Sequence, residues 1–592
     1  MFAKTLRFFD TLRRILGAAL LILLIAIPVA ALLSTHPSVP DGAWLNINPE
    51  GAVVEELNAP DSFPPNFSAA RQTRLRDLIR VVQSAREDQR IVGILLDIQD
   101  LDQASLPALQ SLSAEIDSFR ARGKKVIAYA DHYTQTQYLL AAHADELWLH
   151  PMGMVLLTGL SSYRNYVREA LDRLHVKVHL FRAGSFKSAA EPLVRDSMSD
   201  AARQETQAVL QQLWLAYKTD IAVARDIEAA DIQSMLDDPK SALQAHHGDP
   251  AALAEAMHLV DKLGTRSALL QSLKTGGDEA PAIEFRAYLS SLGSEQGEGK
   301  EGIGILTASG AISDGMLGSG GVNGDAFSEL VDQATDDDSI RAVVLRIDSP
   351  GGSVLASETI RASLQALQQS GKPLVVSMAG MAASGGYWIA AEADEIWTAP
   401  TTLTGSIGVF GVFPNLSGGL DKLGIHSDGV GTTATAGAMR PDRPLSPVMA
   451  DVLQAGVDHI YAEFLDIVGR GRHLDAANVR ELAEGRVWSG SDAVRLGLAD
   501  HLGGIDDAIA AAASRAGLGS DYGIRHILPP QRTIDLLLES LLGDASVAHI
   551  MSRFIPFSEL ALIAEGLRGS HDLLRMLGPR GGIYAYSGFS PS

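Results

Sequence analysis

The chain contains two copies of one sequence module, set 249 positions apart. The stretch ADEIWTAP at residues 393–400 repeats ADELWLHP at residues 144–151, and the same spacing relates residues 343–438 to residues 94–189. Two copies are too few for a solenoid, which stacks three or more short repeats. The sequence therefore predicts two similar folded modules, which arose by duplication of one ancestor or by fusion of a former homodimer.

In each copy, short apolar runs alternate with stretches of helical periodicity. This alternation is typical of an α/β domain with a largely parallel sheet. Strands are expected at residues 44–54, 91–98, 126–130, 342–348 and 373–379 and near Gly304, and helices at residues 69–84 and 106–120. After each core, apolar residues spaced three or four apart predict a long amphipathic helix: Val209, Leu213, Tyr217 and Ile221 in the first copy, and Leu453, Val457, Ile460, Phe464 and Ile467 in the second.

The second copy carries a serine among small residues, Ser384 in MAASGGYW, where the first copy has Gln135. A serine at a strand-to-helix turn can present its hydroxyl clear of the backbone. Its small neighbours leave room for a substrate and leave the Gly385 N–H free at the start of the helix. The alternative interpretation is a tight turn whose serine only caps the helix.

A diglycine precedes that serine in the second copy, in the loop RIDSPGGSV. Gly351 and Gly352 stand where the first copy has Asp102 and Gln103. Glycines before a helix allow backbone N–H groups to point into a cleft, which is the geometry that an oxyanion hole requires. The second copy has therefore kept the residues for acyl transfer, and the first has lost them together.

The first copy supplies the candidate base, Lys187 in AGSFKSAAEP, where the second copy has Ala436. A lysine with its usual pKa is protonated at neutral pH and cannot accept a proton, but burial without a carboxylate partner lowers that pKa. The alternative is a solvated surface lysine. Ser406, in TLTGSIGVFG, is a candidate to orient the lysine or to shuttle its proton; the alternative is a turn serine.

The N-terminus predicts a membrane anchor. Four basic residues within positions 1–14 precede the uncharged apolar run 15–33, whose 19 residues would span about 28 Å as a helix. The basic flank predicts a cytoplasmic N-terminus, with the bulk of the protein on the other side of the membrane. A cleaved signal peptide with a cut near Ala31, or a buried soluble helix, is the alternative.

Composition and motif spacing argue against several other functions. The net charge of −22 argues against nucleic-acid binding, and the absence of cysteine excludes thiolate catalysis and disulfides. GEGKEG at residues 297–302 precedes a strand instead of following one, so it fails as a dinucleotide motif. His132, His143 and His150 lack metal-ligand spacing, so no metal or cofactor is expected. Sixteen histidines leave room for a Ser-His-Asp triad, but no GxSxG elbow surrounds a candidate serine.

Four motifs together, SMAGMAASGGYWIA, TLTGSIGVFG, DSPGGSV and FRAGSFKSAAEP, resemble the long, tandem-domain bacterial signal peptide peptidase (protease IV) family. The resemblance covers residues 44–518 and the anchor; the tail from Gly523 has no match. It implies modules similar to Clp protease and crotonase, and a periplasm-facing serine peptidase of the inner membrane that degrades remnant signal peptides as a homotetramer. It assigns Ser384 as nucleophile, Lys187 as general base and Ser406 as its supporting hydroxyl, with oxyanion N–H groups from Gly352 and Gly385.

The predicted organisation is a basic N-terminus (1–14), an anchor (15–33), a lysine-supplying module (44–290), a serine-supplying module (303–522) and an extension without assigned chemistry (523–592). In that extension, helices are expected at 533–542 and 557–567 and an irregular end from residue 578. Unfolded apolar peptides are the expected substrates, and membrane lipid and further copies of the chain the expected partners. Two alternatives remain: a crotonase-type enzyme acting on acyl thioesters, and a membrane scaffold without activity.

Overall fold

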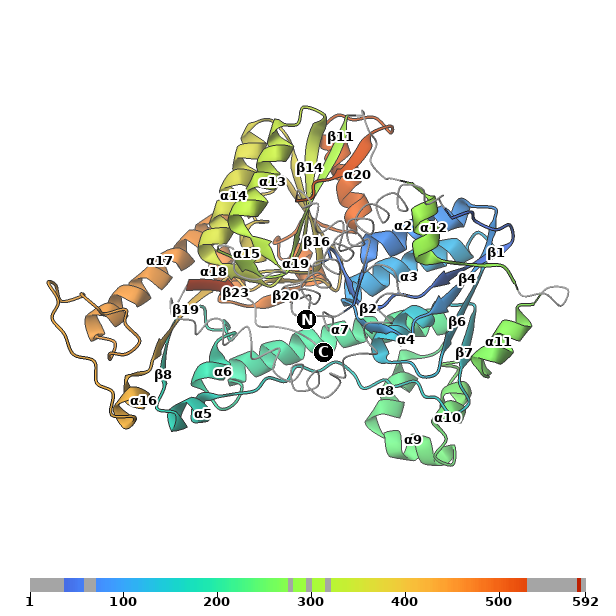
Figure 1. Cartoon of the computed structure of the whole chain (residues 1–592), viewed down its shortest axis with the longest axis horizontal. Coiled ribbons are helices and arrows are strands. Elements are labelled where there is room, and N and C mark those ends of the chain that lie inside the picture. Colours follow the sequence, from blue (N-terminus) through green and yellow to red (C-terminus); the bar gives the residue numbers. More distant parts are fainter. Residues whose placement is uncertain are drawn as a thin grey trace, which may run out of the picture.

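The computed structural model describes residues 37–57, 71–274, 280–293, 301–314 and 321–529 and the strand at 583–586. Within these residues, two mostly parallel sheets with packed helices lie side by side, one from each copy (Figure 1). The α/β fold predicted from the alternating pattern is therefore confirmed.

The first sheet is built entirely of parallel strands in the order β10-β1-β4-β6-β7-β9. Its central strands are mostly apolar because helices and loops cover most of both faces. The strands are β1 (Ala43–Ile47), β4 (Ile91–Asp97), β6 (Lys125–Ala130), β7 (Glu146–Leu149), β9 (Lys262–Leu263) and β10 (Ala282–Glu284), and the helices after β1, β4 and β6 are α2 (Leu75–Glu87), α3 (Leu106–Arg120) and α4 (Gln135–Ala141).

The second sheet repeats this plan with longer central strands, in the order β20-β18-β16-β14-β11-β22; β17 pairs with β16, and β21 pairs with β17. Its last strand, β22, begins at Gly523 and pairs in parallel with β11, one residue beyond the range expected for the second module. The elements are β11 (Gly302–Ser309), α13 (Gly324–Asp336), β14 (Ile340–Ser349), α14 (Val354–Gln369), β16 (Leu374–Ala383), β17 (Glu395–Thr398), β18 (Leu403–Gly405), β20 (Val487–Ser489), β21 (His501–Leu502), α20 (Ile505–Arg515) and β22 (Gly523–His526).

The expected elements are found, with shifts at their ends. The helix predicted at 106–120 has those bounds, whereas the one predicted at 69–84 begins later, at Leu75. The strand predicted at 44–54 is two strands, because residues 48–50 have no regular secondary structure and separate β1 from β2 (Gly51–Val54). β2 lies in a small separate sheet between β3 (Gln72–Arg74) and β5 (Leu101–Gln103).

The duplication is visible in single contacts as well as in the strand order. The buried hydroxyl of Tyr138 donates a hydrogen bond of 2.7 Å to the carbonyl of Leu259, and that of Tyr387 donates one of 2.8 Å to the carbonyl of Leu498. Such a bond satisfies a polar group inside an apolar core and fixes the helix that carries the tyrosine. The two copies therefore share their interior contacts as well as their order of elements.

The two amphipathic helices are α7 (Asp200–Arg225) and α17 (Pro447–Arg472). All four residues of the predicted stripe on α7 are buried. On α17, Val457, Phe464 and Ile467 are buried, whereas Leu453 and Ile460 are partly exposed. Both helices therefore use their stripes for packing.

A third sheet joins the two copies. In it, β8 (Lys177–Ala183) of the first copy pairs antiparallel with β19 (Val409–Asn415) of the second, over seven residue pairs from Val409–Ala183 to Asn415–Lys177. A strand of the first copy thus reaches into the second, as β8 and β19 show in Figure 1. The order is β13-β12-β15-β23-β19-β8, with β12 (Ile312–Ser313), β13 (Val322–Asn323), β15 (Gly351–Ser353) and β23 (Ile583–Tyr586).

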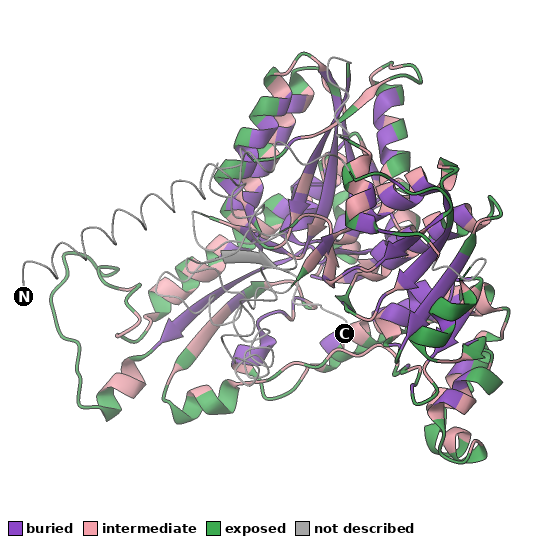
Figure 2. Cartoon of the chain, turned by 45° about the vertical axis from the view of Figure 1, so that its right-hand side comes forward, coloured by how far each residue is buried: buried purple, intermediate pink, exposed green. Residues whose placement is uncertain are grey.

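A buried ion pair also links the copies, away from that sheet. Arg346 of β14 is only 6% exposed, and its guanidinium lies 2.6 Å from the carboxylate of Glu55. In contrast, α5 (Arg168–Arg173) and α16 (Ser417–Lys422) have no buried residues, and they lie on the green, exposed arm of the molecule in Figure 2. The buried part of the junction between the copies therefore lies around β14 and β19.

Several predictions concern the ends of the chain. The anchor at 15–33 and the helices at 533–542 and 557–567 lie outside the described residues, and none of the described helices is long and apolar enough to cross a membrane. The expectation of an irregular end from residue 578 is wrong at residues 583–586, which form β23. Two neighbouring strands each offer an edge there, and pairing with both imposes an extended conformation on those four residues.

Candidate active site

Ser384 occupies a strained turn between β16 and the short helix α15 (Gly385–Trp388). Its φ is +55° and its ψ is −114°, a conformation that costs a non-glycine residue on the order of 1–3 kcal/mol and is typical of functional sites. Its N–H donates to the carbonyl of Gly405 over 2.8 Å, and its carbonyl accepts from the N–H of Trp388. The serine follows β16 directly, not five residues later as the apolar pattern indicates, because β16 continues through the small residues to Ala383.

Lys187 lies just after β8, in a loop that the second copy holds in place. The Phe186 N–H donates to the carbonyl of Glu484 over 2.7 Å, and the Ser185 hydroxyl donates to the Glu484 carboxylate over 2.8 Å. Gly485 packs so closely that a Cβ there would lie 2.6 Å from the backbone nitrogen of Lys187. The lysine is only 2% exposed, so the surface-lysine alternative is wrong.

The lysine and the serine meet in space. Nζ of Lys187 lies 2.6 Å from Oγ of Ser384, 2.8 Å from the carbonyl oxygen of Ser406 and 3.1 Å from its hydroxyl. Ser384 is fully buried and Ser406 is 2% exposed. The two residues that the separate copies kept are therefore within hydrogen-bonding distance, and Ser406 holds the amine from the other side.

Burial sets the charge of this lysine. It lowers the pKa of Lys187 well below the usual value, and the carboxylate of Glu205 opposes that shift only in part. No carboxylate lies within ion-pair distance of Lys187 among the described residues. The amine is therefore shifted toward its neutral form, which can accept the proton of a serine hydroxyl.

The diglycine lies at the start of β15, across from the turn of Ser384. Helix α15, which begins with Gly385, contacts strand β15, which contains Gly352. Gly352 has no space for a side chain, because a Cβ there would lie 1.8 Å from the carbonyl oxygen of Ile312. The two elements that carry the predicted oxyanion N–H groups are therefore neighbours, and one of them starts directly after Ser384.

The matching positions of the other copy have different surroundings. Asp102 and Gln103 are exposed on β5, and Gln135 begins α4, where its side chain accepts a hydrogen bond from the Gly159 N–H. Ala436, the match of Lys187, lies in an exposed, turn-rich stretch. Only one serine–lysine site is therefore assembled in the described part of the chain.

Two charged residues near the site have no sequence signal of their own. Glu205 of α7 accepts a hydrogen bond of 2.5 Å from the Val487 N–H, and Arg486 stacks on the Phe186 ring with its guanidinium carbon 4.0 Å from the ring centre. The Arg486 carbonyl accepts the Ser406 N–H over 2.5 Å. Burial raises the pKa of Glu205 to about 7, although Arg486, Lys187 and Arg164 each lower it. These contacts tie helix α7 to the strand that supports Ser406.

Replacing Glu205 by glutamine is expected to move the acidic limb of the pH–rate profile to lower pH. Glutamine keeps the acceptor for Val487 but not the negative charge, which raises the pKa of Lys187 when Glu205 is ionised. The measurement is kcat/KM against pH, with the same exchange at the exposed Glu228 as control. An unchanged profile, or a shift to higher pH, would show that Glu205 does not act on Lys187.

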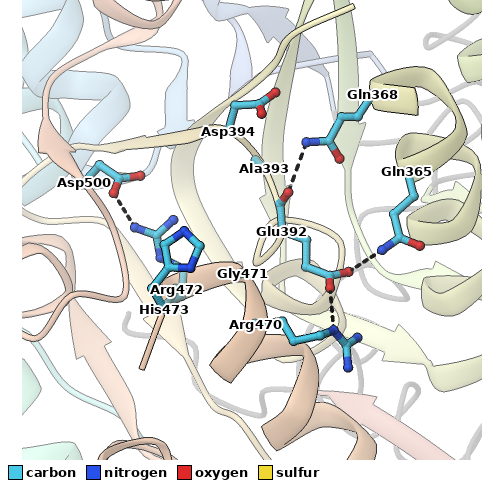
Figure 3. Close-up of a pocket in the computed structure, with 10 residues that line it drawn as sticks. All are labelled: Gln365, Gln368, Glu392, Ala393, Asp394, Arg470, Gly471, Arg472, His473 and Asp500. Atoms are coloured by element: carbon cyan, nitrogen blue, oxygen red, sulfur yellow. Dashed lines mark hydrogen bonds and ion pairs between the residues drawn. The ribbon is translucent and has the colours of Figure 1, made fainter. Parts of the chain in front are cut away.

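A hollow of about 470 Å³ lies at the C-terminal end of α17, and Ser384 is not among the residues that line it (Figure 3). Its charges are mutually satisfied: Glu392 accepts from Gln365 over 2.9 Å and from Arg470 over 3.1 Å, and Arg472 pairs with Asp500. The first copy repeats the last pair as Arg225 and Asp261. We interpret this hollow as part of the packing of the fold.

One of the three histidines considered above, His143, forms ion pairs with carboxylates inside the first copy. His143 lies 2.9 Å from the carboxylate of Asp117 and 3.3 Å from that of Asp220, which help to raise its pKa to about 9 against the effect of burial. Among the described residues, no group of histidine and carboxylate side chains could hold a metal ion.

A buried serine with an amine within hydrogen-bonding distance, set in an α/β core, is the arrangement found in serine hydrolases that use lysine as their base. The model of peptidase family S49 matches residues 118–278 and 366–519, and the chain belongs to this family. It is a serine peptidase, and a serine–lysine dyad is typical of the family. The crotonase-type and scaffold alternatives are thereby excluded.

Relatives agree with this assignment. Protease 4 of Haemophilus influenzae is 39% identical over 79% of this chain and 77% of its own length. A putative signal peptide peptidase SppA of Enterococcus faecium is 32% identical over 36% of this chain and 64% of its own length. Among solved structures, ClpP1 of Listeria monocytogenes aligns with 35% of this chain and 94% of its own at 13% identity, with a TM-score of 0.22, a likeness too low to carry an argument.

Proposed function

We propose that this chain is a membrane-anchored endopeptidase that cleaves apolar, unfolded peptides, including signal peptides left in the membrane. The observation that carries the proposal is the 2.6 Å contact between Lys187 Nζ and Ser384 Oγ in a buried site. The apolar run at 15–33 supports an anchor, and the printed name of the Enterococcus faecium relative supports this substrate class. The inner membrane, with the catalytic part in the periplasm, is the proposed location.

In the proposed mechanism, Ser384 attacks the peptide carbonyl while its proton passes to neutral Lys187. The N–H groups of Gly352 and Gly385 stabilise the oxyanion, and Ser406 keeps the amine directed at the serine. Lys187 then gives the proton to the leaving amine, and an acyl-enzyme remains. In the second half, Lys187 takes a proton from water as the water oxygen attacks the ester, and it gives that proton to Ser384 Oγ as the ester bond breaks and the acid product leaves.

The proposed unit of action is one chain, because β8 of the first copy brings Lys187 to Ser384 of the second copy within the same chain. A homotetramer is proposed from the resemblance of the motifs, and its role would be to enclose the substrate path near the membrane. Neither isolated module would hydrolyse peptides.

The test uses the full chain in detergent and two peptides of equal length, one with a central apolar run and one with that run replaced by serine and glutamine. We expect kcat/KM to be at least about tenfold higher for the apolar peptide, since each buried methylene contributes ~0.8 kcal/mol. Ser384→Ala is the control for a contaminating protease. Equal rates for both peptides would refute the proposed preference for apolar substrates. Rates unaffected by Ser384→Ala would refute the proposed mechanism.

A further inference from the structure

The third sheet is completed by a strand from far along the chain. β23 lies between β15 and β19 and is antiparallel to both: Gly351, Gly352 and Ser353 pair with Tyr586, Ala585 and Tyr584, while Phe410 and Gly411 pair with Tyr584 and Ile583. In Figure 1 the dark-red arrow of β23 lies beside β19. At least 167 residues separate β23 from either neighbour in the sequence, so no hairpin forces this pairing.

Without β23, the sheet has a gap one strand wide. On its other edge β15 pairs with β12, and β19 pairs with β8, so β15 and β19 are joined only through β23. Two antiparallel neighbours of one missing strand stand about 10 Å apart and offer unpaired N–H and C=O groups on both sides. A gap of this kind binds an extended peptide by strand addition.

The gap runs directly past the candidate nucleophile. β15 begins with the diglycine, and β23 also contacts α15, the helix that starts one residue after Ser384. Ser384 is fully buried in this arrangement. A substrate peptide bond that is to reach Ser384 Oγ and the Gly352 backbone must therefore occupy the position held by β23.

The occupying segment suits such a gap. Ile583, Tyr584 and Tyr586 belong to the residue types enriched in strands, and two glycines precede them. The segment contains no proline and no charged residue, so none of its four N–H groups is missing. The same features, apolar and extended, are those proposed for the substrates.

We propose that residues 583–586 bind in the substrate position as an internal competitor, so that the peptidase works only when this segment leaves the gap between β15 and β19. The inference rests on the proposed function in one respect, the identity of the gap as the substrate position. The contact itself is independent of catalysis. Peptides compete with a tethered strand at high effective concentration, so the segment sets a threshold for weakly binding substrates.

The first test alters the strand in the full chain. Tyr584 pairs on both sides, so Tyr584→Pro removes an N–H from the ladder and restricts φ. We expect kcat/KM for a short apolar peptide ester to rise about five- to tenfold, mainly through a lower KM, as the loss of one or two backbone hydrogen bonds implies. Phe589→Pro, three residues beyond the strand, is the matched control and is expected to leave kcat/KM unchanged.

The second test measures binding without catalysis. A fluorescent peptide with the sequence of residues 582–588 is titrated into two inactive proteins, Ser384→Ala and the double variant Ser384→Ala/Tyr584→Pro. Saturable binding to the double variant, and at least about fivefold weaker binding to Ser384→Ala, is expected because the tethered strand fills the gap in the latter. A scrambled peptide serves as the probe control.

The outcomes separate the two proposals. If no variant hydrolyses peptides, the proposed function is refuted. The binding experiment then still tests whether residues 583–586 compete with an added peptide for the gap. Equal peptide binding to both inactive proteins, or no binding to either, overturns the internal competitor. The internal competitor is also overturned if Tyr584→Pro is faster but Ser384→Ala/Tyr584→Pro does not bind the peptide, because the proline would then act elsewhere in the protein.

Discussion

Replacing Lys187 by methionine is expected to abolish peptide hydrolysis while the folded protein becomes at least as stable as before. A general base contributes about 10²–10⁴-fold to the rate, and here no second base lies within hydrogen-bonding distance of Ser384 among the described side chains. Methionine fills nearly the same volume and needs no deprotonation when it is buried. The measurements are kcat for an apolar peptide ester and the thermal unfolding midpoint.

The sign of the stability change follows from the lowered pKa. At neutral pH the lysine is protonated in the unfolded chain, while burial favours its neutral form in the folded protein. Folding then releases a proton, so the wild type loses stability as the pH falls, and the advantage of the methionine variant grows in the same direction. Lys177→Met, the same exchange at an exposed position of β8, is the control. Full activity of Lys187→Met would refute the dyad.

Replacing Gly352 by alanine is expected to reduce kcat on the order of 10²-fold or more, the effect of losing one oxyanion donor. The new Cβ would lie 1.8 Å from the carbonyl oxygen of Ile312 and 2.7 Å from its carbonyl carbon, so β15 must move away from β12. A shift of this size carries the Gly352 N–H out of the position where it faces a substrate carbonyl. The measurement is kcat for a peptide ester, together with an unfolding curve.

The matched control for Gly352→Ala is Gly456→Ala on helix α17, where a Cβ has no neighbour within 4 Å. This exchange should leave kcat unchanged and stabilise the helix by up to about 1 kcal/mol. Wild-type activity in Gly352→Ala would show that the diglycine is needed neither for the oxyanion nor for the placement of β15. Loss of activity with an unchanged unfolding curve would assign the effect to the site itself.

The pairing of Ser384 with Lys187 could be predicted because each stands where the matching position of the other copy has a different residue. Both copies lie inside one chain, so these differences are visible in the sequence without any knowledge of distances. Glu205, Glu484 and Arg486 could not be predicted in the same way, because their contacts to the site come from packing between α7, β20 and the loop after β8. Nothing in the local sequence around these three residues distinguishes them from ordinary surface charges.

The local sequence also fails to predict where β16 ends and that β23 forms. The apolar run of β16 indicates a strand that ends near Ala379, yet pairing with β18 continues it to Ala383 and places Ser384 in the turn itself. The segment 583–586 is too short and too isolated for its pattern to predict a strand, and its conformation is set by two partners that the local sequence does not reveal. Pairing with distant strands decided both cases.

The sequence by itself determined the duplicated α/β plan, the division of serine and lysine between the copies and the glycines beside the serine. Those features are properties of residue types and of spacing along the chain, and burial of apolar runs follows directly from them. Only the tertiary structure decided that β8 crosses to β19, that the lysine amine lies 2.6 Å from the serine hydroxyl, and that β23 fills the gap beside it. The physical reason is that strand partners and buried charges depend on which surfaces meet in space, and an internal repeat does not specify that meeting.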